Sequence, residues 1–160
     1  MSFHPFSAEK TREALRAGTI AQRDEARYWI ASSLCWMFYL YHAGVFGQRW
    51  GWFLLYDVGV ALAILWIGVS ETLKANGGDA GTEYLRRIVL IGTPLGIWVL
   101  VGAQALGWAS WFLFPRLMDA QTFANPELAW QVVTFAMFNG MQITFWWRLH
   151  YHLRQLNRNI

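Results

Sequence analysis

Four long stretches of the chain contain almost no charge, and short polar segments separate them. Residues 28–46, 52–70, 88–114 and 128–147 are apolar, and only the second contains a permanently charged residue, Asp57. Each stretch is close to or above the ~20 residues that an α-helix needs to cross a bilayer. The pattern therefore predicts an all-α integral membrane protein, a bundle of four transmembrane helices.

The third stretch is longer than a single crossing needs, because a helix rises about 1.5 Å per residue. We expect this helix to be tilted, kinked or overhanging, and Pro94 gives a physical reason for a kink near its start. Only residues 47–51 separate the first two helices. We therefore expect these two helices to form an antiparallel hairpin.

Polar segments flank the membrane domain of residues 28–147. Residues 1–27 predict a cytoplasmic amphipathic or interfacial helix, for which Ser7 is a suitable N-cap. Its basic and acidic residues nearly cancel, which favours docking on the bundle or on a partner over binding to lipid through positive charge. Residues 148–160 predict a basic cytoplasmic tail that continues the fourth helix.

The composition supports this class of protein. Hydrophobic residues make up 56% of the chain and charged residues only 14%, whereas soluble domains carry roughly a quarter charged residues. The single cysteine, Cys35, excludes an intrachain disulfide and a zinc site made of cysteines. We find no nucleotide-binding loop, metalloprotease motif or nucleophile motif. The sequence thus leans away from an enzyme without deciding the question, and it offers no support for nucleic-acid binding.

The basic residues predict the orientation in the membrane. With four crossings, both termini and the connection between the second and third helices share one side. That side holds every Lys and Arg except Arg49 and Arg116. The positive-inside rule then places both termini in the cytoplasm of a multi-pass protein of the cell inner membrane.

Two ionisable residues within the apolar stretches are the first candidates for chemistry. His42 and Asp57 lie equally far from the predicted turn, so a hairpin would bring them to one depth. Gln104 and Asn139 of the other two helices complete a candidate intramembrane polar site. This cluster fits a structural role in fixing helix register, a proton or ion relay, or a quinone headgroup site. Metal ligation is poorly supported, because the depth offers no third nitrogen or sulfur ligand.

Basic residues follow the fourth helix and suggest a different kind of contact. Arg148, His150, His152 and Arg154 predict an interfacial collar that contacts phospholipid headgroups. Residues two apart on a helix point to different faces, so the two histidines do not form a chelating pair. His42 and His150 lie near opposite membrane surfaces, which argues against a haem held between them.

Small residues recur at the spacing that permits close helix packing in membranes. They are Gly92 and Gly96 in the third helix, and Gly59 and Ala63 in the second. This spacing does not say whether the contact lies within the chain or with another subunit.

The leading interpretation is an accessory or structural subunit of an inner-membrane complex of respiratory, photosynthetic or transport type. Its partners would be membrane lipid and other membrane subunits or further copies of the chain. The alternative is a small homo-oligomeric channel or proton-coupled transporter that uses Asp57 and His42. A third interpretation is a membrane redox protein that binds quinone. Trp36, Trp66 and Trp98, which lie deep within the predicted helices, would suit packing or contact with lipid, quinone or a pigment.

Overall fold

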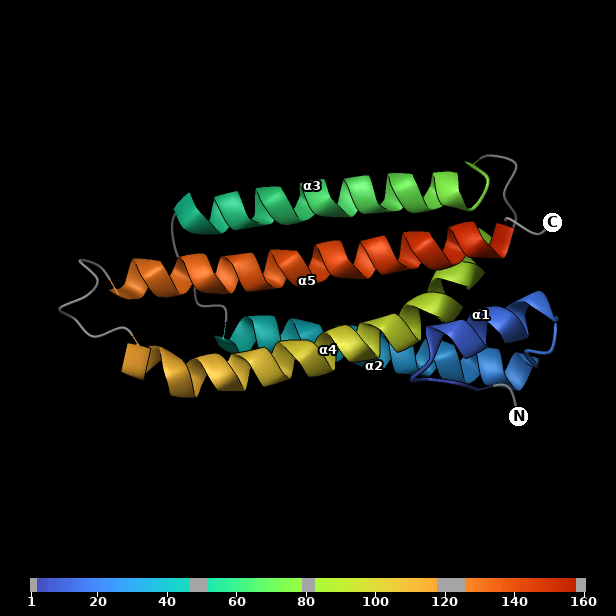
Figure 1. Ribbon diagram of the computed structural model, residues 1–160, viewed down its shortest axis with the longest axis horizontal. Helices are drawn as coiled ribbons and strands as arrows, with labels where there is room; N and C mark the ends of the chain where they lie inside the picture. Colours follow the sequence, from blue (N-terminus) through green and yellow to red (C-terminus); the bar gives the residue numbers. More distant parts are fainter. Residues whose placement is uncertain (1–2, 47–51, 79–82, 118–125, 158–160) are drawn as a thin grey trace.

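The computed structural model describes residues 3–46, 52–78, 83–117 and 126–157, and within these ranges the chain is all-α with no strand. The described helices are shown in Figure 1, and their bounds are α1 Ala8–Arg16, α2 Gln22–Phe46, α3 Trp52–Ala75, α4 Tyr84–Leu117 and α5 Pro126–Asn157. The four longer helices contain the four apolar stretches. The all-α prediction is therefore confirmed for the described part of the chain.

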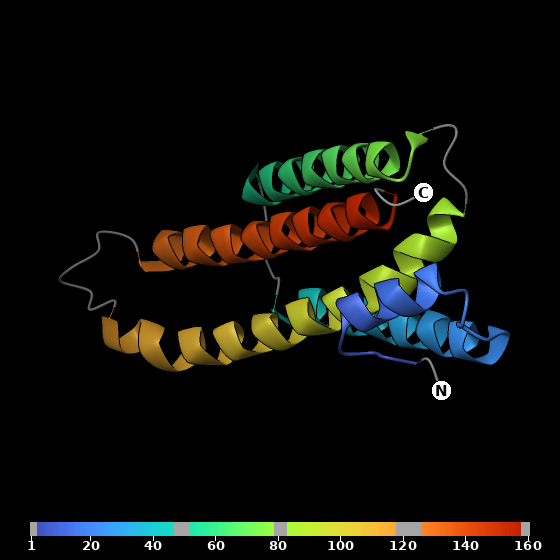
Figure 2. The ribbon, with the colours of Figure 1, turned by 45° about the vertical axis from the view of Figure 1, so that its right-hand side comes forward.

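The four longer helices lie side by side in an order that differs from their order in the chain. α3 packs against α5, α5 against α4, and α4 against α2. The first two long helices were expected to form an antiparallel hairpin, and in Figures 1 and 2 they run in opposite directions. They are not the main packing partners of one another, because α2 packs chiefly on α4 and α3 packs chiefly on α5. The connecting residues 47–51 lie outside the described residues.

The N-terminal segment forms two helical pieces instead of one. Ser7 caps α1 as predicted, since its side-chain oxygen accepts a hydrogen bond from the backbone N–H of Lys10 at 3.3 Å. The helix ends before Gly18, whose positive φ of 63° is a backbone conformation that glycine adopts without strain. α2 then begins at Gln22, so the first long helix starts six residues before the predicted position.

The apolar face of α1 packs on the bundle. Ala8 belongs to a core cluster with Ile91 and Leu95 of α4 and Leu149 and Leu153 of α5. Of the two predicted modes, docking on a partner or on the bundle itself, the structure therefore shows the second. This end of the bundle comprises α1, the first turns of α2 and α4, and the last turns of α3 and α5, and we call it the polar end.

The great length of α4 follows from this packing. Its first turns lie within the polar end, where Leu90 and Ile91 are buried and the Thr93 hydroxyl donates to the Tyr28 carbonyl of α2 at 3.3 Å. α4 continues without interruption through Pro94 to Leu117, and Figure 2 shows that it bends along its course. Of the three expected explanations for its length, the structure shows a bend, while a tilt or an overhang relative to a bilayer stays a prediction.

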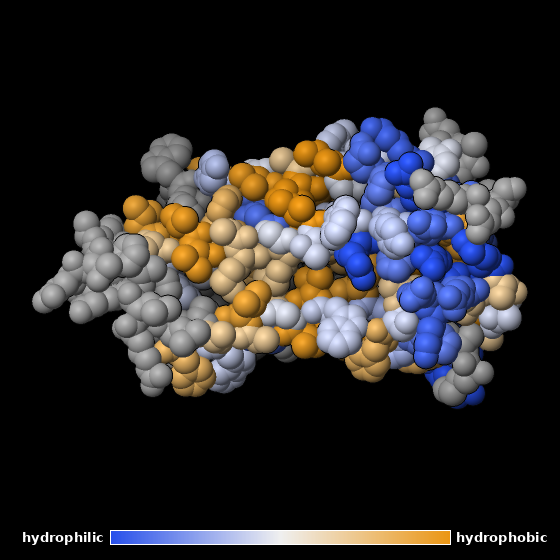
Figure 3. Space-filling model, in the orientation of Figure 1, coloured by the Kyte–Doolittle hydropathy of each residue, from blue (hydrophilic) through white to orange (hydrophobic). Residues whose placement is uncertain are grey.

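Beyond the polar end, the helices bury few of their large side chains. The fully buried large apolar residues among the described ones all belong to the polar end, whereas Trp66 is 77% exposed and Met37 is 67% exposed. On the face drawn in Figure 3, hydrophilic residues gather at the polar end, and the middle of the bundle is mostly apolar or intermediate in hydropathy. By length and composition, two described segments could cross a membrane: Leu55–Ala75 of α3 and Tyr84–Ala109 of α4.

Candidate functional site

The interface between α3 and α5, which we call the α3–α5 seam, brings together two of the four predicted intramembrane residues. The Asn139 side-chain N–H donates to a carboxylate oxygen of Asp57 at 3.2 Å, and also to the backbone carbonyl of Phe135 at 2.9 Å. Asn139 is almost fully buried, and its side-chain oxygen has no hydrogen-bond partner among the described residues. The seam therefore contains an interhelical polar contact within otherwise apolar surroundings.

The other two residues of the predicted cluster have different outcomes. Gln104 is half-buried on α4. His42 lies within α2, and the described part of the chain includes its backbone but not its side chain. The contact of Asp57 with Asn139 is thus observed, and the contact of Asp57 with His42 stays a prediction.

A close approach of the two helices follows further along the seam, at Gly68 of α3. The indole ring of Trp146 from α5 lies against the Gly68 backbone. A methyl group placed on Gly68 would overlap ring atoms Cγ and Cδ2 and lie 2.8 Å from Cδ1. Only glycine therefore permits this arrangement of the tryptophan ring.

The predicted small-residue pairs do not form such an approach within the described part of the chain. Gly92 is buried, and a Cβ there would lie 3.5 Å from the Phe145 ring, an ordinary van der Waals distance. A Cβ on Gly59 or Gly96 would meet nothing within 4 Å. Gly59 and Ala63 lie exposed on α3, and no described helix covers them.

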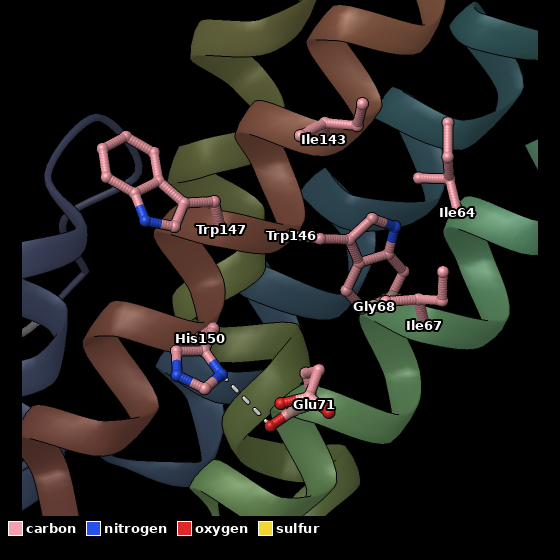
Figure 4. A pocket seen from close by; sticks show the side chains of 8 residues that line it. All are labelled: Ile64, Ile67, Gly68, Glu71, Ile143, Trp146, Trp147 and His150. Carbon is pink, nitrogen blue, oxygen red and sulfur yellow. Dashed lines mark hydrogen bonds between the residues drawn. The ribbon is translucent and has the colours of Figure 1, made fainter.

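An open groove of about 380 Å³ follows the same seam. Figure 4 shows its two walls: α3 contributes Ile64, Ile67 and Glu71, while α5 contributes Ile143 and His150. Trp146 lies between the walls against Gly68. The isoleucines occupy one end of the groove and the polar side chains occupy the other.

The seam closes at the polar end through side chains that bond to the last carbonyls of α3. His150 Nδ1 lies 3.2 Å from the Glu71 carbonyl oxygen, and the Asn157 side chain donates to the Ala75 carbonyl at 2.9 Å. Arg87 of α4 donates to the side-chain oxygens of Asn76 at 3.0 Å and Asn157 at 2.9 Å. Because Ala75 is the last residue of α3, its carbonyl lacks a partner within the helix, and the Asn157 side chain supplies one.

His152 departs from the predicted collar. Arg148 and Arg154 are exposed as expected, but His152 is only 5% exposed, because α1 folds back over this part of α5. Neither of its ring nitrogens has a hydrogen-bond partner among the described residues. Burial, followed by the nearby charges of Arg12 and Arg148, lowers the pKa of His152 to about 4. The residue is therefore neutral near pH 7.

The two histidines lie on different faces of α5, as their spacing predicts. His150 reaches the α3–α5 seam, whereas His152 is buried on α5. Within the described ranges, no group of three or more His, Cys, Asp or Glu residues is placed to hold a metal ion.

Comparisons with known proteins give no assignment. No protein-family model, curated protein or solved structure matches the chain.

The sequence predictions missed the contact of Gly68 with Trp146 and the groove beside it. Gly68 lies nine residues after Gly59 and five after Ala63, so it does not belong to the small-residue pair in α3. The signal that could have indicated it is an isolated glycine inside a long apolar helix, which often marks a close approach to a large side chain.

Proposed function

We propose that the protein is a multi-pass inner-membrane protein in which α2 to α5 cross the bilayer and both termini face the cytoplasm. It serves as an accessory or structural subunit of a larger membrane complex. The distribution of basic residues supports the orientation, because every Lys and Arg except Arg49 and Arg116 lies before residue 28, between residues 74 and 87, or after residue 147.

The exposed apolar face of α3 is the observation that carries the subunit role. α3 packs chiefly on α5, and only 11% of its apolar segment is buried within the chain. Its uncovered surface includes Leu62, Leu65 and Trp66 beside the small residues Gly59 and Ala63. Lipid can cover large apolar side chains, but adjacent small residues additionally allow the backbone of another helix to approach closely. A transmembrane helix of another subunit fits this face.

The subunit role is tested by extraction from its native membrane in a mild detergent, followed by native mass spectrometry. We expect a complex heavier than the 18.5 kDa chain. Gly59→Leu combined with Ala63→Leu should release the partner while leaving the fold intact, because a side chain at Gly59 meets nothing within 4 Å. Gly140→Leu on α5, also in open space, is the matched control. A monomer in the unaltered protein would refute the proposal.

A proton-coupled transporter or channel is the second candidate, and the Asp57–Asn139 contact favours it. Carboxylates inside a bilayer are costly and tend to mark ion or proton pathways. The test is Asp57→Asn in proteoliposomes. Loss of proton flux with retained folding would support transport, whereas unchanged flux would exclude a role for this carboxylate.

A further inference from the structure

The groove along the α3–α5 seam changes in character over a short distance. From Ile64 to Glu71 on α3, and from Ile143 to His150 on α5, each wall advances seven residues, or about 10 Å. One end of the groove is apolar on both walls, and the other carries a carboxylate and an imidazole (Figure 4). A ligand that fits must therefore be apolar along most of its length and polar at one end.

The position of the groove along the helices matches the boundary between acyl chains and headgroups. No charged residue occurs between Asp57 and Glu71 on α3, or between Leu128 and Arg148 on α5. Glu71 and Arg148 are therefore the first charged residues that follow the apolar segments of α3 and α5 toward the cytoplasmic side. The isoleucines of the groove lie on the acyl-chain side of the level of these two residues, and Glu71 and His150 lie at it.

Charges of both signs lie at the polar end of the groove. Lys74 Nζ lies 2.6 Å from a carboxylate oxygen of Glu71, and both side chains are largely exposed. An anionic headgroup would meet the Glu71 carboxylate at close range. A headgroup that carries both a phosphate and an ammonium group complements the pair, with the phosphate at Lys74 and the ammonium at Glu71.

We propose that this groove is a binding site for a phospholipid with a primary-amine headgroup, such as phosphatidylethanolamine. One acyl chain lies along Ile64, Ile67 and Ile143, and the ammonium group donates hydrogen bonds to Glu71. A quaternary ammonium cannot donate, so choline lipids lack this contact. The proposal rests on the membrane location in the proposed function but not on the subunit role.

The contact of Gly68 with Trp146 forms the floor of the site. Because Gly68 has no side chain, the indole ring lies against α3 and leaves the groove open (Figure 4). A methyl group at Gly68 would displace the ring into the space that the acyl chain occupies. Gly59 on the same helix has open space beyond its Cα and provides a matched control.

Native mass spectrometry of the purified full chain in detergent tests the proposal, with phosphatidylethanolamine, phosphatidylcholine and phosphatidylglycerol as separate probes. We expect one phosphatidylethanolamine to bind more tightly than either of the other lipids. Glu71→Gln should weaken its binding roughly three-fold, the size expected for one exposed charge contact, and abolish the preference. Glu13→Gln, an exposed carboxylate on α1, should change nothing. Equal binding of the three lipids would overturn the proposed headgroup.

Two further variants test the acyl-chain part of the site. Gly68→Ala should reduce the binding of all three lipids, whereas Gly59→Ala should not. Ile143→Trp fills the groove from α5 at a position that is 55% exposed, so it should block binding even if Gly68→Ala weakens the fold. Unchanged lipid binding in a folded Ile143→Trp protein would show that the groove is not the site.

Discussion

At the polar end of the bundle, α1, α4 and α5 share a buried core, whereas over the apolar part α3 packs chiefly against α5. The polar end also has cross-helix polar contacts. Arg86 of α4 pairs with Glu25 of α2, and the Tyr28 hydroxyl lies 2.8 Å from the Thr11 hydroxyl of α1. In the apolar part, α3 makes its main described contacts with α5, along the α3–α5 seam.

The polar end and the apolar part of the bundle therefore depend on different surroundings for their stability. The polar end buries its own apolar side chains and so resembles the core of a small soluble domain. The apolar part leaves large side chains uncovered, and exposed apolar surface of this kind is typical of sites that contact a membrane or another protein. Substitutions should therefore affect the folding of the chain mainly at the polar end, and its association mainly in the apolar part.

The largest expected effect is at Leu153, which is fully buried in the core that joins α1, α4 and α5. Leu153→Ala should lower the free energy of unfolding by about 2–5 kcal/mol, because the cavity cannot close completely. Leu62→Ala on α3 is the matched control, since Leu62 is 59% exposed. Thermal unfolding in detergent, followed by circular dichroism, measures both. Equal losses in the two variants would contradict the contrast between the regions.

A smaller loss is expected at Tyr28, whose hydroxyl bridges the Thr11 side chain and the His4 backbone N–H, each at 2.8 Å. Tyr28→Phe leaves the His4 N–H without this partner, which costs roughly 1–3 kcal/mol, while the Thr11 hydroxyl keeps its bonds to the carbonyls of His4 and Ser7. The same unfolding measurement applies, and Tyr151→Phe on the exposed surface of α5 is the control. A loss as large with Tyr151→Phe would show that the bridge is not the cause.

His152 predicts a dependence of stability on pH. The unfolded chain binds a proton at this residue near pH 6.5, while the folded chain does not until about pH 4. The contribution of neutral His152 to the free energy of unfolding is therefore fully present above pH 7, and it is lost as the pH decreases from 6.5 towards 4. His152→Gln should remove this part of the decline. An identical pH profile in the variant would show that another group is responsible.

The smallest effect is expected at Asn139, in the apolar part. Asn139→Leu removes the hydrogen bond to Asp57, and interhelical hydrogen bonds of this kind contribute about 0.6 to 2 kcal/mol. Thr144→Leu on the exposed side of α5 is the control, since its hydroxyl donates to the Gly140 carbonyl of the same helix. A loss above that of Leu153→Ala would reverse the comparison between the two regions.

The absence of charge over long stretches predicts the positions of the helices along the chain well. It cannot predict which helices pack together, because charge-free residues indicate depth and not the direction in which a face points. α2 and α3 illustrate this limit, since the short connection predicts an antiparallel hairpin but does not indicate that each of the two helices packs chiefly on a different helix.

The same limit applies to the candidate site. Asp57 and Asn139 were expected at similar depths, and the seam brings them into contact. His150 and His152 were expected on different faces, but their sequence does not reveal that α1 buries one of them. The contact of Gly68 with Trp146 could not be predicted, because it depends on the rotation of two helices about their own axes.

The parallel course of α3 and α5 has a consequence for the synthesis of the protein. Asp57 contacts Asn139, and Ala75 contacts Asn157, each 82 residues later in the chain. Translation proceeds at roughly 5–20 residues per second, so the contacting part of α5 is synthesised several seconds after α3. During that interval, the apolar face that α5 will cover is open to other helices. The lateral environment of the nascent chain thus helps to decide whether the seam forms correctly.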